Sequence, residues 1–419
     1  MALDGTQDLL ALASNIHEQV ARLQEHLAST GQDSPSFAAD ATPTDWKAVD
    51  DLRSATLENV VRLQDLLYTP REMLQSRMPT DYVSRHAIDR WDLARAVPLD
   101  APISYAALAE KADKPEDKLR RILRHAMAQR IFYEPEPGII AHTQSSRLLA
   151  EDSKLRDYFG TICEEVWPAC TRAVEAIEKW PASRDRSEAG YFVAKGRTLY
   201  QTLEADPRKQ ARYDNAMNAF MDERSHSLEH AVRGFDWGAL GKGTVVHVGG
   251  GLGGPSKALA RAFPNLRLVV QDRQDVLAQA VVEDDLAGRL EFCPHNYFTP
   301  QPVHSADVYF FRRVMMERTD AEVVRMLQAL KPALKVGAVV QIQDFVVPEP
   351  GQCPLWQERK FRSTDMLALA LANAGSRGGE EWERLFEQSG GGFEWNGVRL
   401  FSGSDIAFVE AVWRGEEAV

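Results

Sequence analysis

The 419-residue chain is longer than one hydrophobic core usually supports, so we expect two or more domains. Its 44% hydrophobic and 26% charged residues are typical of a folded globular protein and argue against global disorder. The net charge of -12 disfavours a nucleic-acid partner, which would need a basic surface. No apolar run reaches the roughly 18 residues of a membrane span. The four cysteines lack CxxC spacing and no apolar leader follows MALDGTQD, so we expect no zinc site and a reducing, cytoplasmic setting.

The N-terminal region contains two predicted amphipathic helices. Residues 7–29 carry apolar side chains at spacings of three and four, at Leu9, Leu12, Ile16, Val20, Leu23 and Leu27. A polar segment at 31–45 separates them from a second helix at 46–68, which Pro70 ends. The apolar stripe of residues 7–29 needs a partner surface, either on the body of the chain or on a second subunit.

Residues 82–150 have the order of a winged helix. Short helices precede two extended runs around a Pro-Gly turn in IFYEPEPGIIAHT. The candidate second helix at 115–130 is basic, but the acidic chain favours a structural role over DNA binding. The pattern then stays helical from 155 to 235, and from 243 it changes to alternating strands and helices, which indicates an α/β domain.

A glycine loop opens this α/β region. TVVHVGGGLGGPSKALARAF predicts a strand, a loop and a helix, and Gly249, Gly251 and Gly254 satisfy G-x-G-x-x-G. The next strand ends in Asp272, about twenty residues on, where a carboxylate can accept hydrogen bonds from ribose hydroxyls. Loop and acid predict a nucleoside site, although the glycines alone do not say which nucleoside.

Several segments resemble the S-adenosylmethionine (SAM)-dependent O-methyltransferases of the plant caffeate type and their fungal relatives. They are VVHVGGGLGG, FPNLRLVVQDRQDV, ADVYFFRRV, LQALKPALKVGAVVQIQDFVVPEPG and GSDIAFVEAVW. The N-terminal elements follow that family's order too, so the resemblance spans nearly the whole chain. It implies an α/β Rossmann-like SAM-binding domain preceded by an all-helical dimerisation and winged-helix-like N-terminal domain, in an intertwined homodimer. We expect the dimerisation and winged-helix-like domain at 1–150, a helical connector and substrate-pocket region at 151–238, and the Rossmann-like SAM-binding catalytic domain at 239–419.

The resemblance also implies roles for single residues. SAM, or its demethylated product, would be held by Gly249 and Gly251 at its methionine part, by Asp272 at the ribose, by Asn296 and Tyr297 at the adenine, and by the basic Arg312 nearby. The family usually has an acid at the position of Asn296, but the amide keeps an acceptor, so SAM remains the expected cofactor.

The stretch RRVMMERTD departs from the family. Methylating members have a histidine after this strand as general base; the aligned residue here is Met316, whose thioether cannot take a proton. Three interpretations compete. Met315 and Met316 are simply core; or Glu317, Asp344 or Glu381 serves as a substitute base; or the fold performs different chemistry with SAM as a retained positive centre.

The third interpretation has a parallel in fungal O-methyltransferase-like pericyclases, which this chain resembles in architecture and in lacking the histidine. They dehydrate an alcohol and direct a hetero-Diels–Alder or Alder-ene closure without methyl transfer. We favour such a cyclase of a polyketide or pyridone-type substrate. Arg313 and His142 are candidate donors, unless Arg313 pairs with Glu317 and His142 is structural.

The expected pocket for the small-molecule substrate is apolar. By the resemblance it includes Tyr213, Met217 and the helix DMLALALAN with Leu367, and it also includes Met315, Met316 and Glu381. For the helix, plain core packing is the alternative. The competing functions are an O-methyltransferase acting on a phenolic or polyketide hydroxyl and a catalytically silent SAM-binding partner protein.

Overall fold

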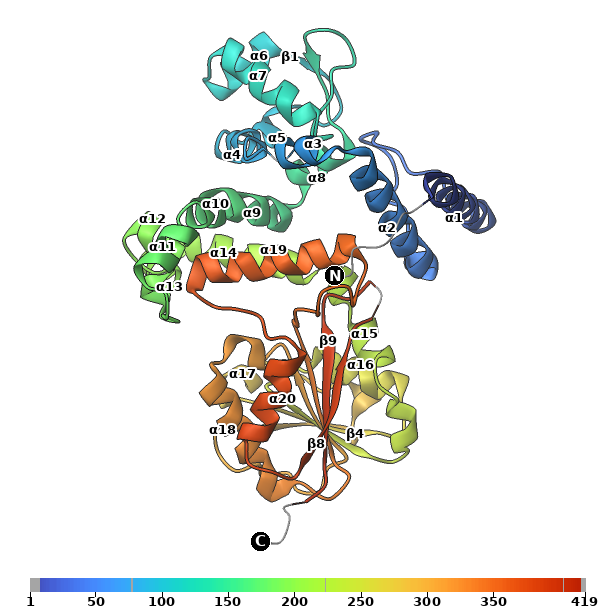
Figure 1. The fold of residues 1–419 in the computed structure, drawn as a ribbon, viewed down its shortest axis with the longest axis vertical. Helices are drawn as coiled ribbons and strands as arrows, with labels where there is room; N and C mark the ends of the chain where they lie inside the picture. The colour runs from blue at the N-terminus through green and yellow to red at the C-terminus, as the bar shows by residue number, and fades with distance from the viewer. Residues whose placement is uncertain (1–7, 77, 223, 402, 416–419) are drawn as a thin grey trace. The chain divides into compact units, whose positions relative to one another are not determined.

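The computed structural model describes residues 8–76, 78–222, 224–401 and 403–415, with the side chains of Met221, Arg224 and Glu317 outside the description. The chain divides into two compact units. The helical unit comprises residues 2–223 and Pro354–Gly375, and the α/β unit comprises residues 224–353 and 376–419. Figure 1 shows the helices and strands of both units.

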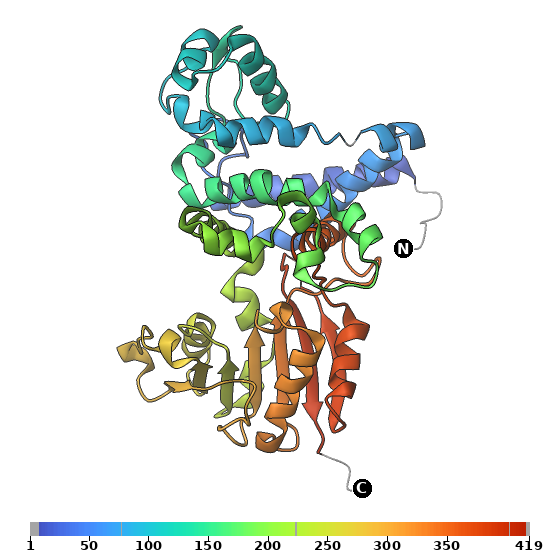
Figure 2. The same cartoon turned by 90° about the vertical axis from the view of Figure 1, so that its left-hand side faces the viewer.

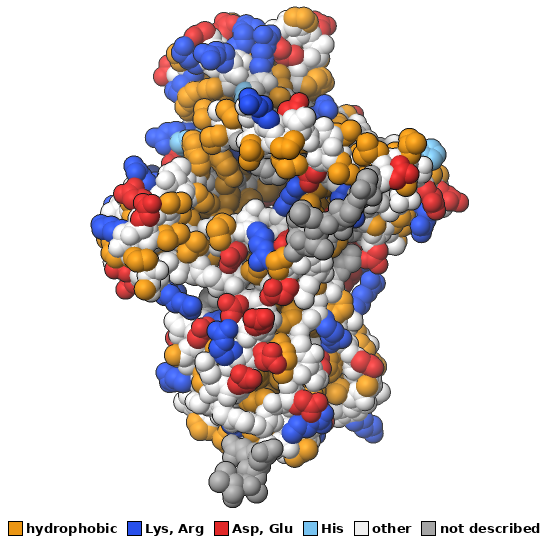
Figure 3. Space-filling model, in the orientation of Figure 1, with side chains coloured by type: hydrophobic (Ala, Val, Ile, Leu, Met, Phe, Trp, Pro, Cys, Tyr) orange, Lys and Arg blue, Asp and Glu red, His pale blue; other side chains and the backbone are white. Residues whose placement is uncertain are grey.

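The predicted N-terminal helices are present. α1 (Leu9–Thr30) is capped at its start by Asp8, whose side chain accepts the N–H of Leu10, and at its end by Gly31, which has a φ of 69°. α2 (Asp50–Leu67) packs against α1. Only part of the apolar stripe of α1 is buried, because Leu9 and Val20 are exposed. Figure 3 shows hydrophobic side chains at the surface of this part of the helical unit.

The winged-helix-like part follows α3 (Pro70–Gln75) and consists of α4 (Asp81–Arg90), α5 (Leu93–Ala96), α6 (Tyr105–Ala112) and α7 (Glu116–Met127). The expected turn forms, since Tyr133 and Ala141 bridge across it. The strand β2 (Ile139–Ile140) also pairs with β1 (Ile103–Ser104), a short strand before α6 that the sequence pattern did not predict.

The rest of the helical unit is built from α8 (Gln144–Glu151), α9 (Ser153–Thr161), the π-helical turn η2 (Ile162–Val166), α10 (Trp167–Cys170), α11 (Ala173–Lys179), α12 (Gly190–Lys195), α13 (Leu199–Ala205) and α14 (Pro207–Met221). The late helix α19 (Leu355–Ala372) belongs to it as well, whereas the sequence boundaries placed these residues with the domain at 239–419. The reason is packing: Ala370 and Leu371 share a core with Tyr191 and Leu199.

The α/β unit contains a mainly parallel sheet, which confirms the predicted Rossmann-like class. Its strands are β3 (Thr244–Val248), β4 (Arg267–Asp272), β5 (Leu290–Pro294), β6 (Val308–Arg312), β7 (Val339–Asp344), β8 (Phe393–Arg399) and β9 (Ala407–Trp413). They lie in the order β5-β4-β3-β6-β7-β9-β8, with β9 antiparallel to both neighbours. Figure 2 shows the sheet broadside, with the red C-terminal strands toward one edge.

Helices cover both faces of this sheet, as expected for buried parallel strands. α18 (Asp320–Leu330) and α20 (Gly379–Gln388) lie on one face, and α15 (Leu228–Arg233) and α16 (Gly254–Ala262) lie on the other (Figure 1). Because β3, β4, β6 and β7 run parallel, their carboxyl ends meet at one edge of the sheet. Open α/β sheets bind ligands at this edge. Among the described helices, none has the length and apolar character needed to cross a membrane.

Candidate active site

The glycine loop follows β3 and leads into α16. Gly249 and Gly251 have φ values of 70° and 56°, which disfavour a side chain. A Cβ on Gly249 would lie 2.8 Å from Cγ2 of Val314, so only glycine fits this close approach between the loop and the segment after β6. The loop can therefore present backbone to a ligand, which is what a nucleoside cofactor needs.

Asp272 lies at the end of β4 and is joined to this loop. Its Oδ2 accepts the N–H of Gly251 at 2.8 Å, and its Oδ1 accepts the N–H of Arg273 at 2.8 Å. A carboxylate offers about four acceptor positions, so these two bonds orient the group and leave capacity for ribose hydroxyls. The arrangement fits the nucleoside part of SAM.

The segment after β5 carries the two residues expected near adenine. Asn296 is exposed and its Oδ1 accepts the N–H of Phe298 at 3.1 Å, which closes a local turn. Tyr297 is half-buried and packs edge-on against Phe298, with the guanidinium of Arg318 5.7 Å from its ring centre. Tyr297 therefore offers a ring beside the strand ends.

Arg312, at the end of β6, is held inside the unit. Its Nη1 donates to Gln343 Oε1 and its Nη2 to the carbonyl of His226, each at 2.8 Å. Burial, and then the charge of Arg313, lower its pKa to about 10, which leaves it charged at neutral pH. Its contacts connect β6, β7 and the turn before α15.

The next residues form a constrained turn. Arg313 has φ of 56°, a left-handed conformation that costs energy for a side-chain-bearing residue and is often found at functional sites. Met315 and Met316 then form the short helix η7 (Met315–Glu317). Met315 is 0% exposed in the core under the sheet, whereas Met316 is 39% exposed. The core interpretation thus holds for Met315, while Met316 presents its thioether at the surface of the unit.

Two side chains hold this turn. Asp344, fully buried at the end of β7, accepts the N–H groups of Met315 and Met316 through Oδ2 at 3.1 and 3.2 Å. Arg377 donates from Nη1 to the carbonyl of Met315 at 2.9 Å and from Nη2 to that of Arg318. Burial raises the pKa of Asp344 to about 7, and the bonds from the two methionines offset part of that rise. Asp344 therefore acts on the turn and is sealed from solvent.

The other two candidate substitute bases lie differently. The Glu381 carboxylate caps α20 by accepting the N–H of Gly378, and the residue is exposed. The side chain of Glu317 falls outside the described residues.

His142, His226 and His247 are candidate proton carriers, and all three are buried. In the helical unit, Nδ1 of His142 lies 2.9 Å from Oγ of Ser146, and Nε2 lies 3.2 Å from the carbonyl oxygen of Val97. Both ring nitrogens of this buried residue are therefore engaged. Burial lowers its pKa and lowers that of His247, under the glycine loop, to about 3. His226 lies 3.9 Å from Asp405 in the α/β unit. These contacts are those of structural histidines.

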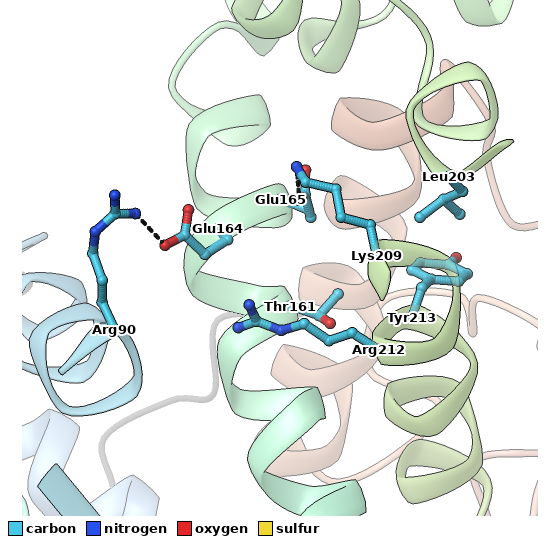
Figure 4. Close-up of a pocket in the computed structure, with 8 residues that line it drawn as sticks. All are labelled: Arg90, Thr161, Glu164, Glu165, Leu203, Lys209, Arg212 and Tyr213. Carbon is cyan, nitrogen blue, oxygen red and sulfur yellow. Dashed lines mark hydrogen bonds and ion pairs between the residues drawn. The ribbon is translucent and has the colours of Figure 1, made fainter. Parts of the chain in front are cut away.

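The expected pocket residues of the helical unit lie near one another. Tyr213 and Leu367 pack at the margin of the same core, with Tyr213 on α14 and Leu367 on α19. Met217 is half-buried one turn beyond Tyr213. Tyr213 also lines a cavity within this unit, together with charged residues from α4, η2 and α14 (Figure 4).

Sequence reasoning missed Arg377, His226 and Asp405. Each reaches the site region through contacts with segments distant in the chain, and no motif marks them.

Comparisons with known proteins agree with this geometry. The model of the O-methyltransferase domain family matches residues 180–394. A Cladonia grayi protein named the grayanic acid biosynthesis cluster O-methyltransferase is 36% identical, over 98% of this chain and 88% of that protein. The chlorophenol O-methyltransferase of Trichoderma longibrachiatum is 34% identical, over 97% of this chain and 90% of that protein.

Solved structures share the fold. CalO1, a methyltransferase in calicheamicin biosynthesis in its SAH-bound form, has a TM-score of 0.62 and 25% identity, over 84% of this chain and 98% of that one. LepI in complex with SAM has a TM-score of 0.65 and 22% identity, over 95% of this chain and 100% of that one. Together with the matched domain and the curated relatives, these findings show that the chain belongs to the O-methyltransferase family, whose cofactor is SAM.

Proposed function

We propose that the chain is a SAM-dependent O-methyltransferase of natural-product metabolism whose acceptor oxygen is already ionised near neutral pH. An acidic phenol or the enol of a polyketide fits this description. The observation that carries the proposal is Met316, which stands on a well-held turn at the position where the family has its histidine base.

The chemistry follows from what a base contributes. General-base assistance is commonly worth 10²–10⁴-fold, but only when the acceptor still carries its proton. When bound, SAM supplies an electrophilic methyl group on a positively charged sulfur. An oxygen that has lost its proton to water then needs only proximity and orientation. The names of the two curated relatives, which mention a chlorophenol and an acid, support acceptors of this kind.

The residues of this chain have separate tasks in the proposal. Gly249, Gly251 and Asp272 bind the cofactor through the loop and the ribose. Asp344 and Arg377 fix the turn, so that Met316 forms part of an apolar wall that excludes water from the acceptor.

A second candidate is the SAM-retaining pericyclase, favoured by the same missing base. In it, Met316 shapes one folded substrate conformer, Arg313 polarises a carbonyl, and the cofactor remains as a fixed charge that stabilises developing negative charge. The likeness to LepI supports the shared fold alone at 22% identity. His142, with both ring nitrogens engaged, is not part of either proposal.

The test uses the full chain with SAM and phenols of graded acidity, followed by mass spectrometry and by the amount of demethylated cofactor formed. We expect products heavier by one methyl group, and a pH profile of kcat/KM that follows the pKa of each acceptor.

Met316→His sharpens this test, with Met316→Leu as the matched control. The imidazole should raise the rate for weakly acidic phenols by up to about 100-fold and leave acidic phenols unchanged, while leucine should change neither. A product that has lost water with no SAM consumed would replace the proposal with the pericyclase. SAM binding without any turnover of natural-product alcohols or phenols would leave only the silent partner protein.

A further inference from the structure

A cavity of about 230 Å³ lies inside the helical unit, between α4, the π-helical turn η2 and α14 (Figure 4). Its wall combines Arg90, Lys209 and Arg212 with Glu164 and Glu165. All of these residues come from the helical unit, and the proposed methyl transfer uses none of them.

The two acids of this cavity already have partners. Glu164 Oε1 lies 2.8 Å from His86 Nε2 and 2.8 Å from Arg90 Nη1. Burial would raise the pKa of Glu164, but these two bonds outweigh it and lower the pKa. The carboxylate of Glu165 accepts the hydroxyl of Tyr191 at 2.6 Å and Lys209 Nζ at 2.9 Å.

The three cations use little of their donor capacity. An arginine has five N–H donors and a lysine three. Arg90 and Lys209 each donate to one carboxylate, and Arg212 donates through Nη2 to Asp89 at 2.7 Å. The exposed fractions of these side chains are 62% for Arg90, 40% for Lys209 and 32% for Arg212. The hydrogen-bonding capacity that this cavity offers to a ligand is therefore mostly donor capacity, which suits an acceptor-rich anion.

The backbone is adapted to hold these side chains. A Cβ on Gly160 would overlap the guanidinium of Arg212 and the carboxylate of Asp89, so glycine allows Arg212 to lie across α9. Glu164 and Glu165 come from η2, a π-helical turn of the kind that recurs at functional sites. In Figure 4 the side chain of Arg90 comes from α4, and those of Lys209 and Arg212 come from α14.

We propose that this cavity binds the carboxylate of a small aromatic acid. Arg212 and Arg90 can bind a carboxylate in the planar, two-point manner that guanidinium groups favour, and Lys209 adds a point charge. Tyr213 and Leu203 line the same cavity and supply apolar surface for the ring. The proposal concerns an anionic group that does not react, and it stands whether or not the chain transfers a methyl group.

Calorimetric titration of the full chain with benzoate, with its neutral isostere benzamide and with inorganic phosphate tests the proposal. Benzoate should bind at least about tenfold more tightly than benzamide, because charge-assisted bonds distinguish the two. Phosphate should bind more weakly than benzoate, since it lacks the ring. Equal affinity for benzoate and benzamide, or tighter binding of phosphate, overturns the assignment.

Variants locate the binding. Arg90→Gln and Lys209→Gln should each weaken benzoate binding about tenfold, and Lys209→Arg should restore it. In Arg90→Gln, Glu164 keeps its contact with His86, and in Lys209→Gln, Glu165 keeps its bond from Tyr191. We therefore expect both variants to fold.

Arg172→Gln and Lys154→Gln are matched controls. They remove exposed cations paired with Glu175 and Asp222 elsewhere in the helical unit and should leave binding unchanged. Unchanged benzoate affinity in the cavity variants, with unfolding temperatures equal to the wild type, refutes the site.

Adding SAM distinguishes two roles of the bound aromatic acid, and the proposed site is compatible with both. Methylation of a bound hydroxybenzoate, lost in Lys209→Gln, identifies the ligand as the acceptor. Benzoate binding that persists while a separate phenol is methylated identifies it as a second ligand.

Discussion

Asp344 allows a quantitative test of how the turn beneath Met316 is held. Its carboxyl is fully buried, and Oδ1 has no hydrogen-bond partner among the described atoms, while Oδ2 accepts the N–H groups of Met315 and Met316. Asp344→Asn keeps a carbonyl acceptor for both N–H groups and removes the titration. The comparison between the two proteins therefore isolates the cost of ionising Asp344 in the folded state.

The sign and size follow from linkage. The folded pKa is raised from 3.8 to about 7, so the stability contributed by the neutral carboxyl is fully present below pH 4 and is lost as the pH rises through 7. At about 1.36 kcal/mol per unit, a rise of about 3 units corresponds to roughly 4 kcal/mol. Between pH 4.5 and 8, the unfolding free energy of the wild type should fall by about 3 kcal/mol relative to Asp344→Asn.

Urea unfolding followed by tryptophan fluorescence at both pH values measures this difference. Asp307→Asn is a control that should show little change between these two pH values. Burial would raise the pKa of Asp307, but bonds from Lys335 and the Thr244 N–H lower it below 3.8, so its stabilisation is complete above about pH 4 and is lost only at lower pH. Parallel pH dependence of wild type and Asp344→Asn would refute a neutral buried carboxyl, and would mean that the nearby guanidinium groups keep it ionised.

Three further predictions concern the cofactor, the turn and assembly. Asp272→Ala should weaken SAM binding by about 1.5–3 kcal/mol in calorimetry, and a wild type that releases no heat with SAM would contradict the cofactor site. Arg377→Met removes the donor to the Met315 carbonyl, so it should lower turnover more than SAM affinity; equal losses in both would contradict a role confined to the turn. We expect a homodimer formed by the exposed apolar face of the N-terminal helices, so Leu10→Glu with Leu67→Glu should give a monomer in light scattering, and a monomeric wild type would contradict the dimer.

The parts of this protein that sequence could predict are those that lie close together in the chain. The glycine loop and Asp272 are about twenty residues apart in one strand–helix–strand unit, so pattern and spacing were sufficient. The contact of Arg377 with Met315 joins residues 62 positions apart, and no local pattern encodes it. The position of α19 in the helical unit was missed for the same reason, because a helix rich in leucine and alanine can pack against either unit.

Met315 and Met316 show most clearly what cannot be predicted from the sequence, and they also bear on the function of the site. Met315 and Met316 are chemically identical, yet one fills the core and the other is exposed, because Asp344 and Arg377 fix the turn that separates them. That arrangement has a cost, since a buried carboxyl with one unpartnered oxygen destabilises the fold at neutral pH, and an amide or apolar side chain would avoid it. Arg313 adds a strained left-handed backbone two residues earlier. Locally unfavourable features that do not stabilise the fold are expected at functional sites. A chain that had lost its chemistry together with its histidine would have no need of them, which favours an enzyme that works without the base over a silent SAM-binding protein.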